Sequence, residues 1–163
     1  MLIGVDASRA LRAQRTGTER YALEIIQHLL ALPQARQHQW RLYVDHQPRG
    51  DEVWAADRLP SHVEFAVLPA RRMWTHRALA TEIHSRPPSV IFVPSHVLPL
   101  VVPPRRLPPS VVTVHDLGYH YFPSAHPLRQ RLYVDWGTRW SVAAATAVIA
   151  ISNATAADLQ RLT

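Results

Sequence analysis

The chain has 163 residues, of which 47% are hydrophobic, so it can bury the core of one ordinary domain. It has no cysteine, which excludes a disulfide framework and cysteine-ligated zinc and favours a cytoplasmic location. All 18 basic residues are arginines and the formal charge is +6, which suits phosphate-bearing partners. Because the arginines are scattered and no nucleic-acid-binding motif is present, we expect no nucleic acid among the partners.

The first half of the chain predicts strands that alternate with helices. Strands are expected at residues 2–6, 40–45 and 63–68, and helices at 18–32 and 70–86. The first helix places one apolar face on Tyr21, Ile25, Leu29 and Leu32. The second begins with Arg71-Arg72-Met73-Trp74, which suits either an ordinary amphipathic helix or a peripheral contact with the anionic inner face of a membrane.

The second half continues the alternation. Strands are expected at residues 90–93, 111–114 and 147–151, and the six prolines of residues 94–109 predict an extended loop at the rim of the sheet. Between the last two strands, a helix carries an apolar stripe that we expect in the core: Leu128, Leu132, Trp136, Trp140 and Ala144. Ser152 is a suitable cap for a final helix over residues 154–162. The pattern predicts an α/β fold, a Rossmann-like, doubly wound, mainly parallel sheet with helices on both faces.

The most informative segment is the apolar run Val111–Val114, which ends abruptly in His115 and Asp116. Ligands of open α/β sheets bind at the carboxyl ends of the strands, so both residues are candidate catalytic groups. Adjacent residues on a strand point to opposite sides, so different roles are expected. A structural alternative remains open, in which His115 bridges backbone groups and Asp116 caps a turn.

A second candidate is the loop before the first helix, where Gly17 and Thr18 coincide with the helix N-terminus that attracts phosphate. It matches neither G-x-G-x-x-G nor a Walker loop, and a glycine turn with Thr18 as helix cap explains it equally well. Arg129 is a candidate contact for an acidic acceptor, and a solvated helix position is the alternative.

Three segments together resemble the N-terminal half of a family 4 glycosyltransferase of the GT-B fold, in the group 1, mannosyltransferase-like class. They are Ile3–Ala7 with Thr16–Tyr21, Val112–Leu117 with Pro123, and Ala147–Ser152 with Ala154–Leu159. The resemblance implies an acceptor-side domain over residues 1–163 that faces a C-terminal nucleotide-sugar domain across a cleft. It also implies metal-independent, retaining transfer of a hexose from a nucleotide-diphosphate sugar to a glycan or lipid-linked acceptor, as in polysaccharide biosynthesis in bacteria.

The same resemblance assigns roles to residues. It places Gly17 near the donor diphosphate and His115 opposite the transferred sugar or the acceptor hydroxyl, with Asp116, Ser152 and Asn153 as further candidates. Relatives bind most of the donor through an E-x7-E motif, and this chain has none. We therefore expect the C-terminal domain to be missing from this chain and the 163-residue fragment to be inactive.

Two other functions stay open. A metal-dependent phosphohydrolase would use His115, Asp116 and His120, with His126 nearby, although their spacing fits no standard zinc pattern. A non-catalytic module would dock a partner or an anionic lipid through its basic face.

Overall fold

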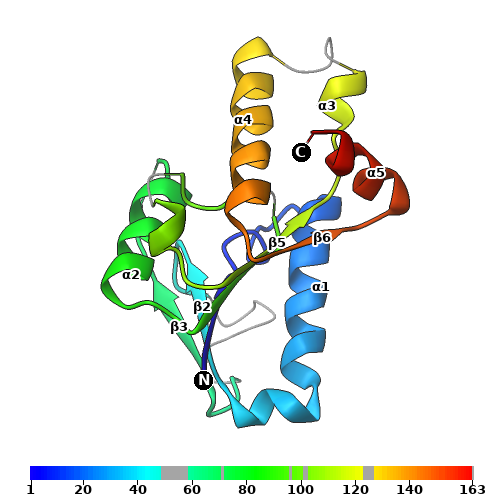
Figure 1. Ribbon diagram of the computed structural model, residues 1–163. Coiled ribbons are helices and arrows are strands. Elements are labelled where there is room, and N and C mark those ends of the chain that lie inside the picture. Colours follow the sequence, from blue (N-terminus) through cyan, green and yellow to red (C-terminus); the bar gives the residue numbers. More distant parts are fainter. Residues whose placement is uncertain (49–58, 71, 96, 101–102, 123–126, 163) are drawn as a thin grey trace.

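A six-stranded parallel sheet forms the centre of the molecule (Figure 1). This computed structural model describes residues 1–48, 59–70, 72–95, 97–100, 103–122 and 127–162. The strands lie in the order β3-β2-β1-β4-β5-β6, and all neighbouring pairs are parallel. Their bounds are β1 Leu2–Asp6, β2 Gln39–Val44, β3 Val63–Val67, β4 Val90–Val93, β5 Ser110–Val114 and β6 Ala147–Ala150. The order reverses between β1 and β4, and such a switch point is where open α/β sheets bind ligands.

Helices cover both faces of this sheet, as the sequence predicts. α1 packs on one face against β1 and β2, while α2 and α4 contribute to the core on the other face (Figure 1). The helices are α1 Gly17–Ala31, α2 Ala80–Ser85, α3 Gly118–Tyr121, α4 Leu128–Ala144 and α5 Asn153–Leu162. Short turns of other helical types are the 3₁₀ turns η1 Pro33–Gln37 and η4 Pro104–Arg106 and the π-helical turn η3 Thr75–Leu79. The α/β, Rossmann-like fold class is confirmed.

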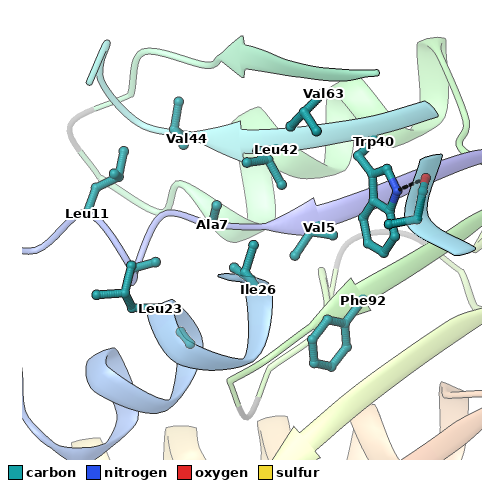
Figure 2. Close-up of a cluster of buried hydrophobic side chains, with 13 residues drawn as sticks. Val5, Ala7, Leu11, Leu23, Ile26, Trp40, Leu42, Val44, Val63 and Phe92 are labelled. Atoms are coloured by element: carbon teal, nitrogen blue, oxygen red, sulfur yellow. Dashed lines mark hydrogen bonds between the residues drawn. The ribbon is translucent and has the colours of Figure 1, made fainter. Parts of the chain in front are cut away.

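The core between α1 and the sheet contains branched strand residues, the phenyl ring of Phe92 and the indole of Trp40 (Figure 2). Trp40 donates a hydrogen bond from Nε1 to the carbonyl of Ala35, 3.0 Å away, which satisfies its buried N–H. α1 enters this core through Ala22, Leu23 and Ile26. Of the predicted face, Ile25 and Leu29 pack against this core, whereas Tyr21 turns toward the ring of His115 and Leu32 is 49% exposed.

The apolar stripe of α4 is the largest departure from prediction. Leu128, Leu132 and Trp136 are 59%, 58% and 57% exposed, so the expectation of a core stripe is wrong for these three, while Trp140 and Ala144 are partly buried. The buried residues of α4 are instead Gly137, Thr138 and Ser141.

Small residues fix the position of α4 because they allow close approach of the backbone. The Ser141 hydroxyl accepts a hydrogen bond from the backbone N–H of Leu98 at 2.9 Å and donates one to the carbonyl of Gly137 at 2.7 Å. A Cβ at Gly137 would come within 3.3 Å of a methyl group of Val97. Close packing and hydrogen bonding to the segment after β4 thus outweigh burial of the large side chains.

The helix predicted over residues 70–86 begins later than expected, and Arg71 lies outside the described residues. Met73 has a φ of +54°, in the left-handed region, and the π-helical turn η3 precedes α2. Trp74 is partly buried and donates a hydrogen bond from Nε1 to the carbonyl of Leu68 at 2.8 Å. The indole is therefore tied to the core rather than to an exposed amphipathic face.

The remaining boundaries agree with prediction to within one or two residues. Within the described part of residues 94–109, η4 is the one helical turn, as the prolines require. Ser152 caps α5, because its hydroxyl accepts the backbone N–H of Thr155 at 3.1 Å. β6 forms an edge of the sheet, which leaves Ile149 40% exposed.

Candidate functional site

A cavity of about 670 Å³ opens at the carboxyl ends of β1, β4 and β5. This volume falls in the range of small-molecule sites, roughly 300–1,000 Å³. The walls combine residues that directly follow strands with residues of α1 and α4. Its lining includes Asp6, Ser95 and Asp116 from the strand ends, and Thr18, Glu19 and Tyr133 from the helices.

His115 lies just beyond β5 with only 6% of its surface exposed. Its Nε2 is 2.9 Å from the carbonyl oxygen of Pro94, and its ring meets the ring of Tyr21 edge-on with centroids 4.9 Å apart. Because a carbonyl can only accept a hydrogen bond, the neutral ring carries its proton on Nε2, and Nδ1 is the basic nitrogen. His115 thus makes the backbone contact of the structural alternative.

Asp116 is exposed and lines the cavity, whereas His115 is buried, so the two residues point to different sides as predicted. One carboxylate oxygen, Oδ1, accepts the backbone N–H of Gly118 at 2.9 Å, at the start of α3. Asp116 therefore caps this turn and also lines the cavity. The backbone contacts of the structural interpretation are present for both residues, and their catalytic roles stay predictions.

The start of α1 forms one wall of the cavity. The helix cap is Thr16 rather than Thr18, so that part of the prediction is wrong. The Glu19 carboxylate accepts the backbone N–H of Thr16 at 3.1 Å as well as its hydroxyl. The hydroxyl of Thr16 is the main cause that lowers the pKa of Glu19 below its ordinary value of 4.5.

Gly17 leaves open space at this helix end. A Cβ there would meet no atom within 4 Å, and no described glycine has a positive φ. The turn therefore does not require a glycine, and the free space is compatible with a ligand that approaches the first-turn N–H groups.

Asp6 is a cavity residue that the sequence reasoning did not single out. It ends β1, is 3% exposed, and accepts hydrogen bonds on Oδ1 from the hydroxyl of Ser8 at 2.6 Å and the backbone N–H of Ser8 at 3.1 Å. Burial raises its pKa, and the bonds from Ser8 oppose that shift. A carboxylate directly after a buried strand was the available signal, the same signal that identified Asp116.

Arg9 and Tyr133 were also not predicted. Arg9 lines the cavity and pairs with Glu19, with Nη1 3.1 Å from Oε1. Tyr133 belongs to α4, and no local pattern in the sequence indicates that its side chain turns toward the strand ends.

His115, Gly17 and the remaining predicted residues lie outside the lining of this cavity. His120 borders a neighbouring cavity of about 420 Å³ and has its Nε2 2.9 Å from Oδ1 of Asp135. Ser152 caps α5, Asn153 is exposed at its first position, and Arg129 is exposed on α4. Of the predicted site residues, the structure thus brings Thr18 and Asp116 together at the cavity. The roles assigned to the predicted residues stay predictions.

Metal ligands were considered in the phosphohydrolase hypothesis. In the part of the chain that the structure describes, no three His, Asp or Glu side chains are grouped so that they could hold a metal ion. His126 lies outside the described residues. Across the same described part, none of the helices combines the length and the apolar character needed to cross a membrane.

The fold is an α/β domain with a cavity at the switch point of a parallel sheet, the place where such sheets bind ligands. The model of the family Glycosyltransferase Family 4 matches residues 15–163, and the chain belongs to this family. No curated protein matches the chain. Its chemistry is therefore glycosyl transfer, which requires a sugar donor and an acceptor.

Proposed function

We propose that this chain is the acceptor-side, N-terminal domain of a retaining glycosyltransferase that transfers a hexose from a nucleotide-diphosphate sugar to a glycan or lipid-linked acceptor, without a metal ion. The observation that carries the proposal is the cavity at the ends of β1, β4 and β5 in a family 4 domain. We place the enzyme in the cytoplasm, with a peripheral contact at the inner face of the membrane.

The leaving nucleoside diphosphate needs fixed positive charge, and helix N-termini supply it. The first turn of α1 borders the cavity, and Gly17 leaves the space for close approach. Arg9 adds a guanidinium whose charge is balanced by Glu19. These features support a location for the donor phosphates at this wall.

Donor binding also needs a second wall in this proposal. The chain lacks the E-x7-E motif by which relatives bind the donor, so a C-terminal domain would complete the cleft and exclude water from it. We expect the full-length enzyme to release nucleoside diphosphate when it is given a panel of nucleotide hexoses and glycan or lipid-linked acceptors. The 163-residue chain alone should show negligible turnover, and robust transfer by it would refute this division of labour.

His115 is proposed to act on the acceptor hydroxyl or the transferred sugar. Its Nε2 bonds to the carbonyl of Pro94, which fixes the tautomer of the neutral ring. In the full-length enzyme, we expect His115→Ala to lower kcat by about 10²-fold, the usual scale of acid–base catalysis.

A matched variant separates this role from the structural one. His115→Gln has an amide N–H that can still donate to the Pro94 carbonyl, but it has no nitrogen that titrates. We expect it to keep the thermal stability of the wild type and to lose as much turnover as His115→Ala. Wild-type kcat in His115→Gln would assign His115 a structural role only.

A further inference from the structure

His76 is a buried histidine that the proposed reaction does not use. It is 4% exposed and belongs to the π-helical turn η3, whose first residue, Thr75, lines the cavity. The backbone N–H groups of His76 and Arg77 both donate to the carbonyl of Met73, the residue with φ of +54°. Positive φ at a non-glycine residue and π-helical turns are both costly, and both are frequent at functional sites.

The hydrogen bonds of His76 determine which nitrogen carries its proton. Nδ1 accepts the backbone N–H of Leu100 at 3.1 Å, so Nδ1 is unprotonated. Burial lowers the pKa of His76, which keeps the ring neutral. The single proton therefore lies on Nε2, which donates to the hydroxyl oxygen of Tyr133 at 2.6 Å.

The hydrogen bond from His76 determines where the phenolic proton of Tyr133 can point. Since its oxygen accepts from His76, the phenolic proton must point elsewhere, and Tyr133 is 46% exposed in the wall of the cavity. Burial raises the pKa of Tyr133, and nearby Arg9 opposes the shift without cancelling it. The hydroxyl thus remains protonated at neutral pH and is a hydrogen-bond donor to whatever fills the cavity.

The charges that face Tyr133 indicate the class of ligand. Arg9 is already paired with Glu19, and Asp116 adds a further carboxylate, so the cavity presents donors and acceptors together rather than a field of one sign. Hydroxyl groups both donate and accept hydrogen bonds, and a polyhydroxylated ring matches such a mixed lining.

We propose that Tyr133 binds a hydroxyl oxygen of the acceptor sugar, and that His76 is the positioning residue that holds the Tyr133 hydroxyl in its donating orientation. The proposal rests on the function proposed above, because it takes the sugar in the cavity to be the acceptor. It assigns a substrate contact to a residue 57 positions away from its positioning partner.

The test measures binding to the 163-residue chain, so it is independent of turnover. Methyl α-glucopyranoside, methyl α-mannopyranoside and methyl α-galactopyranoside are titrated up to high millimolar concentration and followed by NMR. We expect at least one of them to bind the wild type. Its Kd should rise about 3- to 10-fold in Tyr133→Phe, the effect of one neutral hydrogen bond.

Variants of His76 test the positioning step. His76→Leu should weaken binding as much as Tyr133→Phe, and the double variant should be no weaker than Tyr133→Phe alone, because both changes remove one coupled contact. His76→Gln keeps an amide N–H for Tyr133 and should restore binding. Tyr121→Phe is the matched control, since Tyr121 bonds to Asp158 outside the cavity lining.

Two results would overturn the proposal: no glycoside binding to the wild type, or equal Kd values in the wild type and Tyr133→Phe. Additive losses in the double variant would overturn the role of His76. Thermal unfolding of each variant identifies those that fail to fold. If the His76 variants fail to fold, the Tyr133→Phe titration alone tests the proposal. Absence of turnover in the full-length enzyme with intact glycoside binding would instead contradict the proposed function alone.

Discussion

Glu19 joins two walls of the cavity, and its removal should destabilise the domain by about 1.5 kcal/mol. In Glu19→Ala, the hydrogen bonds from Thr16 are lost, and loss of such a helix-capping interaction costs about 1 kcal/mol. The ion pair with Arg9 adds only about 0.5 kcal/mol, because the Arg9 side chain is 54% exposed and solvent screens the pair.

The pH dependence of this effect has a definite sign. The bond from the Thr16 hydroxyl, above all, lowers the pKa of Glu19 in the folded chain below its ordinary value of 4.5. The carboxylate therefore stabilises the fold fully above about pH 4.5, and this contribution is lost as the pH falls through the folded-state pKa. The difference in unfolding free energy between the wild type and Glu19→Ala should shrink accordingly in acid.

The assay is urea denaturation followed by circular dichroism, at pH 7 and in steps to about pH 3. Glu19→Gln is the control, because its amide oxygen can still accept the N–H of Thr16 but carries no charge. It should lose about half as much stability as Glu19→Ala at pH 7. A loss below about 0.3 kcal/mol in Glu19→Ala at pH 7, or one that stays constant down to pH 3, would refute the reasoning.

Four other substitutions test the packing of the domain and the proposed position of the donor phosphates. Leu132→Ala should change the unfolding free energy by less than about 0.5 kcal/mol in urea denaturation, because Leu132 is 58% exposed. Leu79→Ala should cost about 2–5 kcal/mol, because Leu79 is fully buried. Similar losses in the two variants would mean that Leu132 is buried in the core, as the sequence predicted. Gly4→Ala should cost about 1–3 kcal/mol in the same assay, because its Cβ would lie 2.8 Å from Cε2 of Tyr43, and an unchanged midpoint would contradict this crowding. Gly17→Ala should leave the melting temperature equal or slightly higher, since its Cβ meets open space. The same substitution should weaken nucleoside diphosphate binding to the full-length enzyme, measured by calorimetry. Unchanged affinity would show that the donor phosphates do not bind at this wall.

The strands could be predicted because they carry their signal locally. Val111–Val114 is apolar without alternation, as expected for a strand covered on both faces, and the following His115 and Asp116 mark its carboxyl end. The parallel sheet follows from strands that alternate with helices. Asp6 ends β1 in the same way, so the same signal, a carboxylate at the end of a buried strand, could have predicted this residue of the site.

The face of α4 could not be predicted, because apolar periodicity assumes that a helix packs through its large side chains. α4 packs through Gly137, Thr138 and Ser141, and the hydrogen bond from Leu98 to Ser141 depends on a loop far away in the sequence. Tyr133 reaches the cavity as a consequence of that orientation. Its contact with His76 also depends on the π-helical turn, which no residue pattern in the sequence indicates.

The described residues of the segment 94–100 connect both histidines to the cavity. The carbonyl of Pro94 accepts the Nε2 proton of His115, and the N–H of Leu100 donates to Nδ1 of His76. The segment thus selects the same tautomer in two rings by opposite means, through an acceptor at Nε2 in one ring and a donor at Nδ1 in the other. Because the N–H of Leu98 also bonds to Ser141, a displacement of this segment would disturb α4 and both rings together. The prolines that exclude regular structure here leave backbone groups available for side chains, which is why an irregular loop can fix the tautomers of two histidines beside the site.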